Sequence, residues 1–214
     1  MNRVDQRDID RRKLEIEEIV NHALQSSRTS GDEIPRNRRL AWFKKPGSNQ
    51  KSLVLLDPKD YGNNPDDPAG YKVYERVREL ALELRGFHET ADPIPNTLPC
   101  RGWYEDQATA QFYFILHLPP ECEMPSINTR IRTLHEMYKK SRPSVGARIK
   151  LSRSLAATIL QVHRRGWMHK GIRSDNILFF SRTPSSWPDL GKPRLVGFDY
   201  ARRDNPWEYS EKPM

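Results

Sequence analysis

The chain has 214 residues, of which 36% are apolar and 30% are charged, and its formal net charge is +8. This length predicts one domain, or one domain with a tail. No run of about 20 apolar residues occurs, which excludes a transmembrane helix. The opening residues are charged and polar, so we expect no secretory leader.

Two cysteines, Cys100 and Cys122, are present, and no CxxC pair. Two cysteines cannot build a disulfide framework, and the spacing of a structural zinc site is missing. We therefore expect reduced thiols in an intracellular, cytoplasmic protein. The positive charge attracts polyanions, but the basic residues are scattered and match no zinc-finger, RNP or basic-zipper pattern. Nucleic acid is therefore not the expected partner.

The first part of the chain predicts a helix followed by a hairpin. Residues 8–28 place apolar side chains three and four positions apart, as in an amphipathic helix. Residues 29–39, with Gly, Pro and many charges, are predicted to be a linker. Residues 40–43 and 52–56 are apolar runs on either side of turn residues, which predicts a hairpin. Residues 57–70, rich in Pro, Asn, Asp and Gly, are expected to form a mobile loop.

The middle of the chain predicts strands and three further helices. Residues 71–86 form a helical pattern with one apolar stripe, and residues 103–104 and 111–116 are aromatic and β-branched, as in strands. Residues 127–140 are predicted to be helical. Residues 144–163 predict a longer, well-buried helix with Ser144 as its N-cap, because leucine, isoleucine and valine repeat along one face.

Short apolar runs at residues 177–180 and 195–196 predict two more strands after that helix. Strands with one helix, then helices, then short strands indicate an α+β fold. The predicted divisions are an N-terminal helix and linker, a small lobe and a partial large lobe, at residues 1–39, 40–120 and 121–214.

The most specific segment begins at His169. Residues 169–176 have the sequence H-K-G-I-R-S-D-N, and Gly197-Phe198-Asp199 follows a short strand some twenty residues later. Protein kinases carry H-R-D-L-x-x-x-N in the catalytic loop and then D-F-G. The spacing of the histidine and the asparagine is the same in both.

This segment resembles the fungal protein-kinase-like domains found with HeLo or prion-inhibition domains. They carry a similar H-K-x-x-R-S-D-N-I-L-F-F run and a G-F-[DE]-Y-[AS]-R run. The resemblance is strong over residues 145–205 and looser over 40–120. It implies a protein-kinase-like fold with a small antiparallel-sheet lobe and an incomplete, mainly helical large lobe, truncated after the start of the activation segment. It also implies a link to fungal signalling or incompatibility.

Two departures from the kinase pattern argue against catalysis. The loop aspartate that accepts the substrate proton is replaced by Gly171, and the aspartate that holds magnesium is replaced by Gly197. Asn176 remains as a metal ligand of the pattern. Mg²⁺ usually needs one or two carboxylates, so an amide alone is a poor site.

Asp199 is the alternative metal ligand, beside Asn176. On an extended strand, its two-residue offset from Gly197 moves the carboxylate about 6–7 Å, too far for coordination near 2 Å. A bulge or turned loop would be required. Otherwise Asp199 is a turn residue that pairs with Arg202 or Arg203.

The remaining catalytic-loop and nucleotide positions are interpreted through the resemblance. His169 braces the loop as a satisfied, semi-buried histidine. Arg173 takes the catalytic-loop lysine position and binds a phosphate, or forms a salt bridge with Asp175 or Asp199. Lys59 is the small-lobe lysine that, with Asn176, would face ATP.

Two features weaken the nucleotide site. Pro58 suggests that the strand ends before Lys59. The hairpin tip at residues 44–48 holds one glycine, whereas a kinase phosphate loop is glycine-rich. The candidate ion-pair partners of Lys59 lie on the 71–86 helix, where they could equally form its solvated face: Glu75, Glu79 and Glu83.

The preferred function is a pseudokinase domain that acts as a binding or regulatory module for a protein partner, with ATP and Mg as possible ligands. A divergent ATP-dependent Ser/Thr protein kinase is the first alternative. A basic module that binds nucleic acid or an acidic surface is the second. Without the helices that complete a kinase large lobe, the 144–163 helix is expected to expose part of its apolar face.

Overall fold

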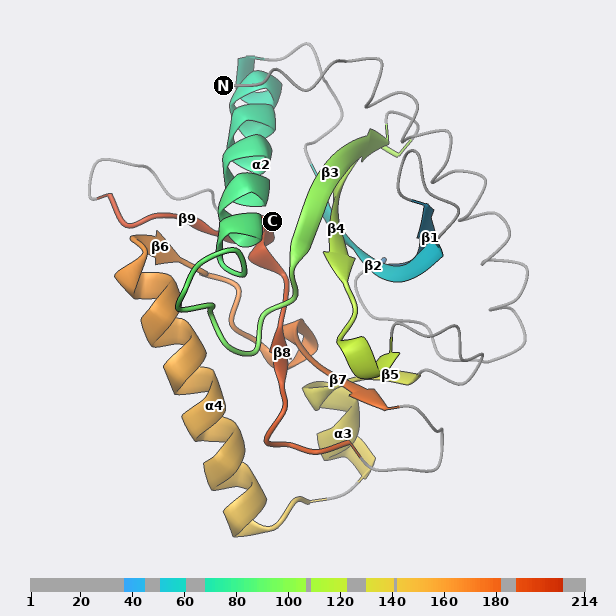
Figure 1. Cartoon of the computed structure of the whole chain (residues 1–214), viewed down its shortest axis with the longest axis vertical. Helices are drawn as coiled ribbons and strands as arrows, with labels where there is room; N and C mark the ends of the chain where they lie inside the picture. Colours follow the sequence, from blue (N-terminus) through green and yellow to red (C-terminus); the bar gives the residue numbers. More distant parts are fainter. Residues whose placement is uncertain are drawn as a thin grey trace.

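The structure is a computed structural model that describes residues 37–44, 51–60, 68–106, 109–122, 130–140, 142–181 and 188–205. Within these ranges it is an α+β arrangement of antiparallel sheets and three α-helices (Figure 1). The predicted helix over residues 8–28 and the hairpin tip over 45–48 lie outside the described residues. None of the described helices has the length and apolar composition needed to cross a membrane.

The largest sheet has four antiparallel strands in the order β1-β2-β4-β3. These are β1 (Arg39–Lys44), β2 (Lys51–Asp60), β3 (Cys100–Asp106) and β4 (Gln111–His117). Both the predicted hairpin and the predicted strand pair are confirmed. In Figure 1 the sheet is strongly twisted, with β1 at its outer edge.

The expected end of the strand at Pro58 is wrong. Strand β2 continues through Pro58, opposite Tyr113, and Lys59, opposite Phe112, of β4. Strand β1 pairs only with residues 51–56 of β2. Among the described residues, β2 therefore has a strand neighbour on one side only from Asp57 onward, and a proline's missing N–H is tolerated at such an edge. Residues 57–60 are strand and not the mobile loop expected for 57–70.

Helix α2 (Pro68–Gly86) confirms the helix predicted over residues 71–86. It lies beside β3 (Figure 1). Tyr74 meets the Trp103 ring of β3 edge-on, with 5.1 Å between ring centroids. The apolar stripe accounts for this position, since its central members are buried in the core: Val77, Leu80, Ala81 and Leu84.

The helix predicted over residues 127–140 is described from residue 130 onward, and its first four described residues form a strand instead. Strand β5 (Arg130–Thr133) precedes helix α3 (Leu134–Lys140). The Thr133 hydroxyl accepts a hydrogen bond from the Glu136 N–H at 3.1 Å, and the Glu136 carboxylate accepts one from the Thr133 N–H at 2.9 Å. This reciprocal capping box fixes the helix start after Thr133.

Helix α4 (Val145–Arg164) confirms the predicted long helix, and Ser144 caps it by accepting a hydrogen bond from the Ala147 N–H at 3.2 Å. Four short strands follow. They are β6 (Trp167–Met168), β7 (Ile177–Ser181), β8 (Arg194–Leu195) and β9 (Arg202–Arg203). Strands β5, β7 and β8 form one small sheet, and β6 and β9 form another.

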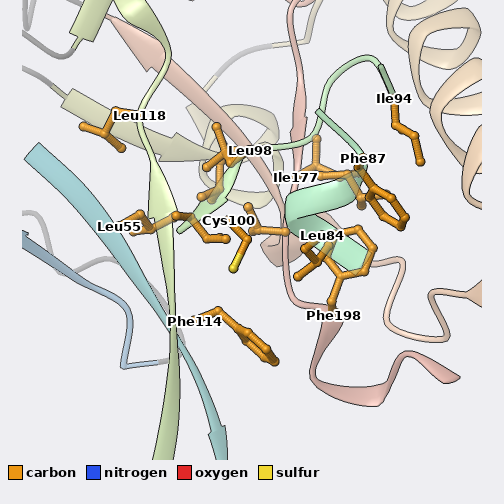
Figure 2. Close-up of a cluster of buried hydrophobic side chains, with 14 of the residues drawn as sticks. Leu55, Leu84, Phe87, Ile94, Leu98, Cys100, Phe114, Leu118, Ile177 and Phe198 are labelled. Carbon is orange, nitrogen blue, oxygen red and sulfur yellow. The ribbon is translucent and has the colours of Figure 1, made fainter. Parts of the chain in front are cut away.

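One hydrophobic core joins the four-stranded sheet to the C-terminal segments (Figure 2). Leu55 and Phe114 come from the sheet, while Phe198 follows β8 and meets Phe87, with ring centroids 6.4 Å apart. Cys100 and Cys122 are both buried, and neither forms a disulfide within the described residues. Burial raises the pKa of Cys100 to about 12, which makes this thiol unreactive.

Candidate functional site

The two segments singled out in the sequence lie against each other. The loop over residues 169–176 ends in a 3₁₀ turn, Ser174–Asn176, directly before β7. Residue Gly197 comes just after β8, which pairs with β7. The Val196 N–H donates to the Asn176 carbonyl at 3.0 Å, so the two segments meet at Asn176.

The side chain of Asn176 is completely buried, and both ends of its amide are hydrogen-bonded. Its Nδ2 donates to the Gly171 carbonyl at 2.7 Å. Its Oδ1 accepts a hydrogen bond from Nη2 of Arg38 at 2.5 Å. The oxygen that the kinase pattern would offer to a metal ion is therefore engaged by a cation from within the chain.

Arg38 is 4% exposed and makes three hydrogen bonds inside the protein. Besides Asn176, it donates from Nε to Oδ1 of Asp57 at 2.6 Å and from Nη1 to the Asp175 carbonyl at 2.8 Å. The other oxygen of Asp57 accepts the Gly197 N–H at 2.8 Å. We call Arg38, Asp57, Asn176 and Gly197 the Arg38 network.

The Arg38 network balances its own charge. A guanidinium stays protonated in proteins, so Arg38 is a permanent buried cation. The carboxylate of Asp57 supplies the opposite charge, and neutral oxygens of Asp175 and Asn176 supply the remaining acceptors. A buried ion pair is tolerated when its other polar atoms are also hydrogen-bonded.

Glycine is required at both positions where kinases carry aspartate. Gly197 has a φ of +77°, and a Cβ there would lie 2.3 Å from the Asn176 amide. A Cβ at Gly171 would lie 2.9 Å from the Gly197 carbonyl oxygen and 3.3 Å from Nδ2 of Asn176. The Asn176 amide therefore occupies the space that a side chain at position 197 would need, and the Gly197 carbonyl blocks a side chain at position 171.

His169 is buried, as expected for a histidine that braces the loop. Its Nε2 lies 3.1 Å from the Val196 carbonyl, and its Nδ1 accepts the Gly171 N–H at 3.1 Å. Because a carbonyl only accepts, the proton must be on Nε2. Burial lowers the pKa of His169 to about 4, so the ring is neutral at pH 7.

Lys59 and Asp199 meet through the backbone. Lys59 is buried, and its Nζ donates to the Asp199 carbonyl oxygen at 2.7 Å. Asp199 lies in a 3₁₀ turn, Phe198–Tyr200, and not on the extended strand assumed from the sequence. The turned loop that a rescue by Asp199 required is therefore present. The backbone carbonyl of Asp199, and not its carboxylate, accepts the hydrogen bond from Lys59, the lysine that the resemblance assigns to ATP.

Three further charged residues were named in the sequence analysis: Arg173, Glu75 and Glu83. Arg173 is exposed, and among the described residues no ion pair joins it to Asp175. Glu83 pairs with Arg203 at 2.7 Å. Glu75, another of the helix glutamates proposed as partners of Lys59, pairs with Arg78 at 3.4 Å.

A pocket of about 550 Å³ lies at the start of α4, away from the Arg38 network. Met137, Pro143 and Leu190 are among its lining residues, and all of the residues that line it come from outside that network. Across the described ranges, no three His, Cys, Asp or Glu side chains gather as a metal site would require.

Arg38 and Asp57 are the functional residues that the sequence analysis missed. The linker prediction included Arg38, and the loop prediction included Asp57. Only the apolar run before Asp57, at residues 53–56, could have indicated a buried carboxylate. The pairing itself joins residues 19 positions apart, and the contact with Asn176 spans 138 positions.

Comparisons with known proteins add no relative: no protein-family model matches the sequence, and no curated protein matches it. The kinase resemblance of residues 169–176 and 197–199 therefore remains a prediction. What the chain can do must be argued from the geometry of the Arg38 network and from its surface.

Proposed function

We propose that this protein is a kinase-like domain that does not transfer phosphate and instead serves as a binding or regulatory module. The observation that carries the proposal is the 2.5 Å hydrogen bond from Arg38 to Oδ1 of Asn176. That oxygen is the one metal ligand of the kinase pattern that the sequence keeps. A guanidinium beside it repels a second cation.

The chain also lacks the general base that phosphoryl transfer requires. Gly171 stands where a kinase places the aspartate that accepts the substrate proton. The loss of a general base commonly costs about 10²–10⁴ in rate. His169 is no substitute, because it is buried and both ring nitrogens have partners.

Two features support the kinase-like part of the proposal. An antiparallel sheet with one helix beside it precedes a more helical part, in the order expected of the two lobes. The loop over residues 169–176 lies against Gly197 through Asn176, as the catalytic loop lies beside the metal-binding segment in the pattern.

Thermal unfolding with ATP, with and without Mg²⁺, tests the proposal directly. A ligand present at 100 times its Kd stabilises the folded state by about 2.7 kcal/mol. We expect no rise in Tm at millimolar ATP and Mg²⁺, and no transfer of phosphate from labelled ATP to a general protein substrate.

If phosphate transfer were detected, a matched control variant would show whether it depends on the candidate site. Mg²⁺-dependent transfer that disappears in Asn176→Ala or Asp199→Ala, and persists in the exposed-site variant Lys192→Ala, would contradict the proposal. It would favour the divergent kinase instead.

A further inference from the structure

Helix α4 has apolar side chains on two opposite faces. Leu151 and Val162 point into the core and are buried. On the other side, Val145 is 62% exposed, Ile149 57% and Leu160 51%. At about 100° per residue these three fall within roughly 60° of arc, opposite the buried side. The outward face of a surface helix is normally polar.

The outward stripe is interrupted between Ile149 and Ala156, where Ser152 and Arg153 take the intervening positions, and it has basic borders. Ala156 lies between Ile149 and Leu160 on the same face and is exposed. Arg148 borders one side of the stripe, and further exposed arginines border the other: Arg153 and Arg164. Helix α4 contains no Asp or Glu. We call the four apolar residues and the three arginines the α4 outer face.

We propose that the α4 outer face binds an acidic amphipathic helix of a protein partner. Val145, Ile149, Ala156 and Leu160 repeat at the spacing with which one helix packs along another. Arginine binds carboxylates through two parallel hydrogen bonds, so acidic residues on the edges of the partner helix would complete the contact. This inference names the partner chemistry of the proposed binding module and rests on that function.

The charges argue against a second copy of this chain. An antiparallel or parallel pair of α4 helices would bring two sets of arginines together with no acid between them, and like charges across an interface are unfavourable. Figure 1 shows α4 running along one edge of the molecule, where a partner helix can approach it.

The composition of the stripe argues against a membrane surface. Helices that lie in the lipid interface usually present Trp, Phe and Leu on a wide apolar face. Here the stripe has no aromatic residue, and Ala156 at its centre would add little on insertion. A small residue at that point instead lets a second helix come close.

The test uses the full chain and a fluorescent synthetic peptide of about 22 residues. The peptide carries leucines at helical spacing, flanked by glutamates, and its binding is followed by fluorescence anisotropy. We expect saturable binding that weakens at least tenfold in the double variant Ile149→Asn/Leu160→Asn. We expect a similar loss in Arg153→Glu/Arg164→Glu, and a weaker affinity at high salt because the contact is partly ionic.

Leu82→Asn is the matched control, since Leu82 is a 60% exposed leucine on α2. It should bind the peptide as the parent protein does. A second peptide, with lysine in place of each glutamate, should bind at least tenfold more weakly. Circular dichroism of each variant establishes that the helices are intact.

Several outcomes would overturn the inference. They are no binding of the acidic peptide, equal loss in Leu82→Asn, dimerisation that Ile149→Asn/Leu160→Asn abolishes, or stronger binding to phosphatidylserine vesicles that the same variant abolishes. Phosphate transfer measured on the same preparations separates the two proposals. No transfer and no peptide binding overturns the inference and leaves the proposed function standing, whereas transfer together with peptide binding overturns the proposed function alone.

Discussion

The Arg38 network and the α4 outer face invert the usual placement of polar and apolar groups. In the network, a guanidinium and a carboxylate lie in the interior, with Arg38 only 4% exposed. On the outer face, Ile149 and Leu160 are more than half exposed. Charged residues are usually outside and large aliphatic ones inside.

The two regions differ in whether their side chains find interaction partners within the described chain. The buried charges satisfy each other, since Asp57 binds Arg38 through one oxygen and the Gly197 N–H through the other. The exposed aliphatic side chains have no such partner within the described chain. This contrast supports the two proposals: Arg38 engages the one metal-ligand oxygen that the kinase pattern leaves, and a partner binds on the surface of α4. Each prediction below tests one side of that comparison.

The largest effect is expected from Asp57→Ala. This variant leaves the Arg38 guanidinium buried without its carboxylate, and breaking a buried ion pair in this way costs about 3–5 kcal/mol. The free energy of unfolding, measured by urea denaturation, should fall by that amount. Asp204→Ala, which removes an exposed carboxylate, should change it by less than about 0.5 kcal/mol.

The double variant Arg38→Met/Asp57→Ala sharpens this result. Because it removes both charges, it should lose less stability than Asp57→Ala alone, although the hydrogen bond to Asn176 is lost too. Strictly additive losses would mean that the two residues do not form a coupled pair, and the account of the network given above would be wrong.

The second prediction concerns Gly197→Ala. The left-handed conformation at φ +77° costs a non-glycine residue about 1–2 kcal/mol. Displacement of the Asn176 amide by the new Cβ adds about 1–3 kcal/mol. In contrast, Gly146 in α4 has open space around it. Gly146→Ala should stabilise the helix by about 0.5–1 kcal/mol, and equal losses in the two variants would contradict the close packing at Gly197.

The third prediction is a loss of stability in acid through His169. Its pKa is about 4 in the folded protein, against 6.5 for an unperturbed histidine. Between these values the unfolded chain binds more protons, so stability falls as the pH is lowered from about 6.5 toward 4. The gap corresponds to about 3 kcal/mol.

Denaturation curves at several pH values between 4 and 7 measure this slope. His169→Gln should flatten it, whatever its effect on stability at neutral pH. His117, whose pKa burial also lowers to about 4, contributes in the same direction and remains in the variant. A slope as steep in His169→Gln as in the parent protein would contradict the assignment to His169.

Much of the fold followed from local sequence patterns. Helices α2 and α4 could be predicted because their apolar periodicities extend over many residues, and the hairpin because two apolar runs flank turn residues. The β5 strand could not, because Ile131 and Thr133 alternate with arginines over only four residues, and α3 continues directly after them. Their period-two pattern is too short to outweigh the helical pattern that follows.

Part of the candidate site could likewise be predicted from the sequence, and part could not. The sequence brought Asn176, Gly171 and Gly197 together because two kinase-like motifs at a characteristic spacing contain them. It could not reveal Arg38, since no local pattern connects a linker arginine to a loop 138 residues later. The two glycines at kinase aspartate positions indicated a loss of catalysis, but only the structure identified Arg38 as the side chain that binds the remaining asparagine.

The smallest expected effect lies on the α4 outer face. Ile149→Gln should change the free energy of unfolding by less than about 0.5 kcal/mol, because the side chain is 57% exposed and is not part of the hydrophobic core. Leu151→Ala, two residues away on the buried side of α4, should cost about 2–5 kcal/mol. If Ile149→Gln destabilised the isolated chain as strongly, the outer face would be part of this protein's own core, and an external helix would have no surface to bind.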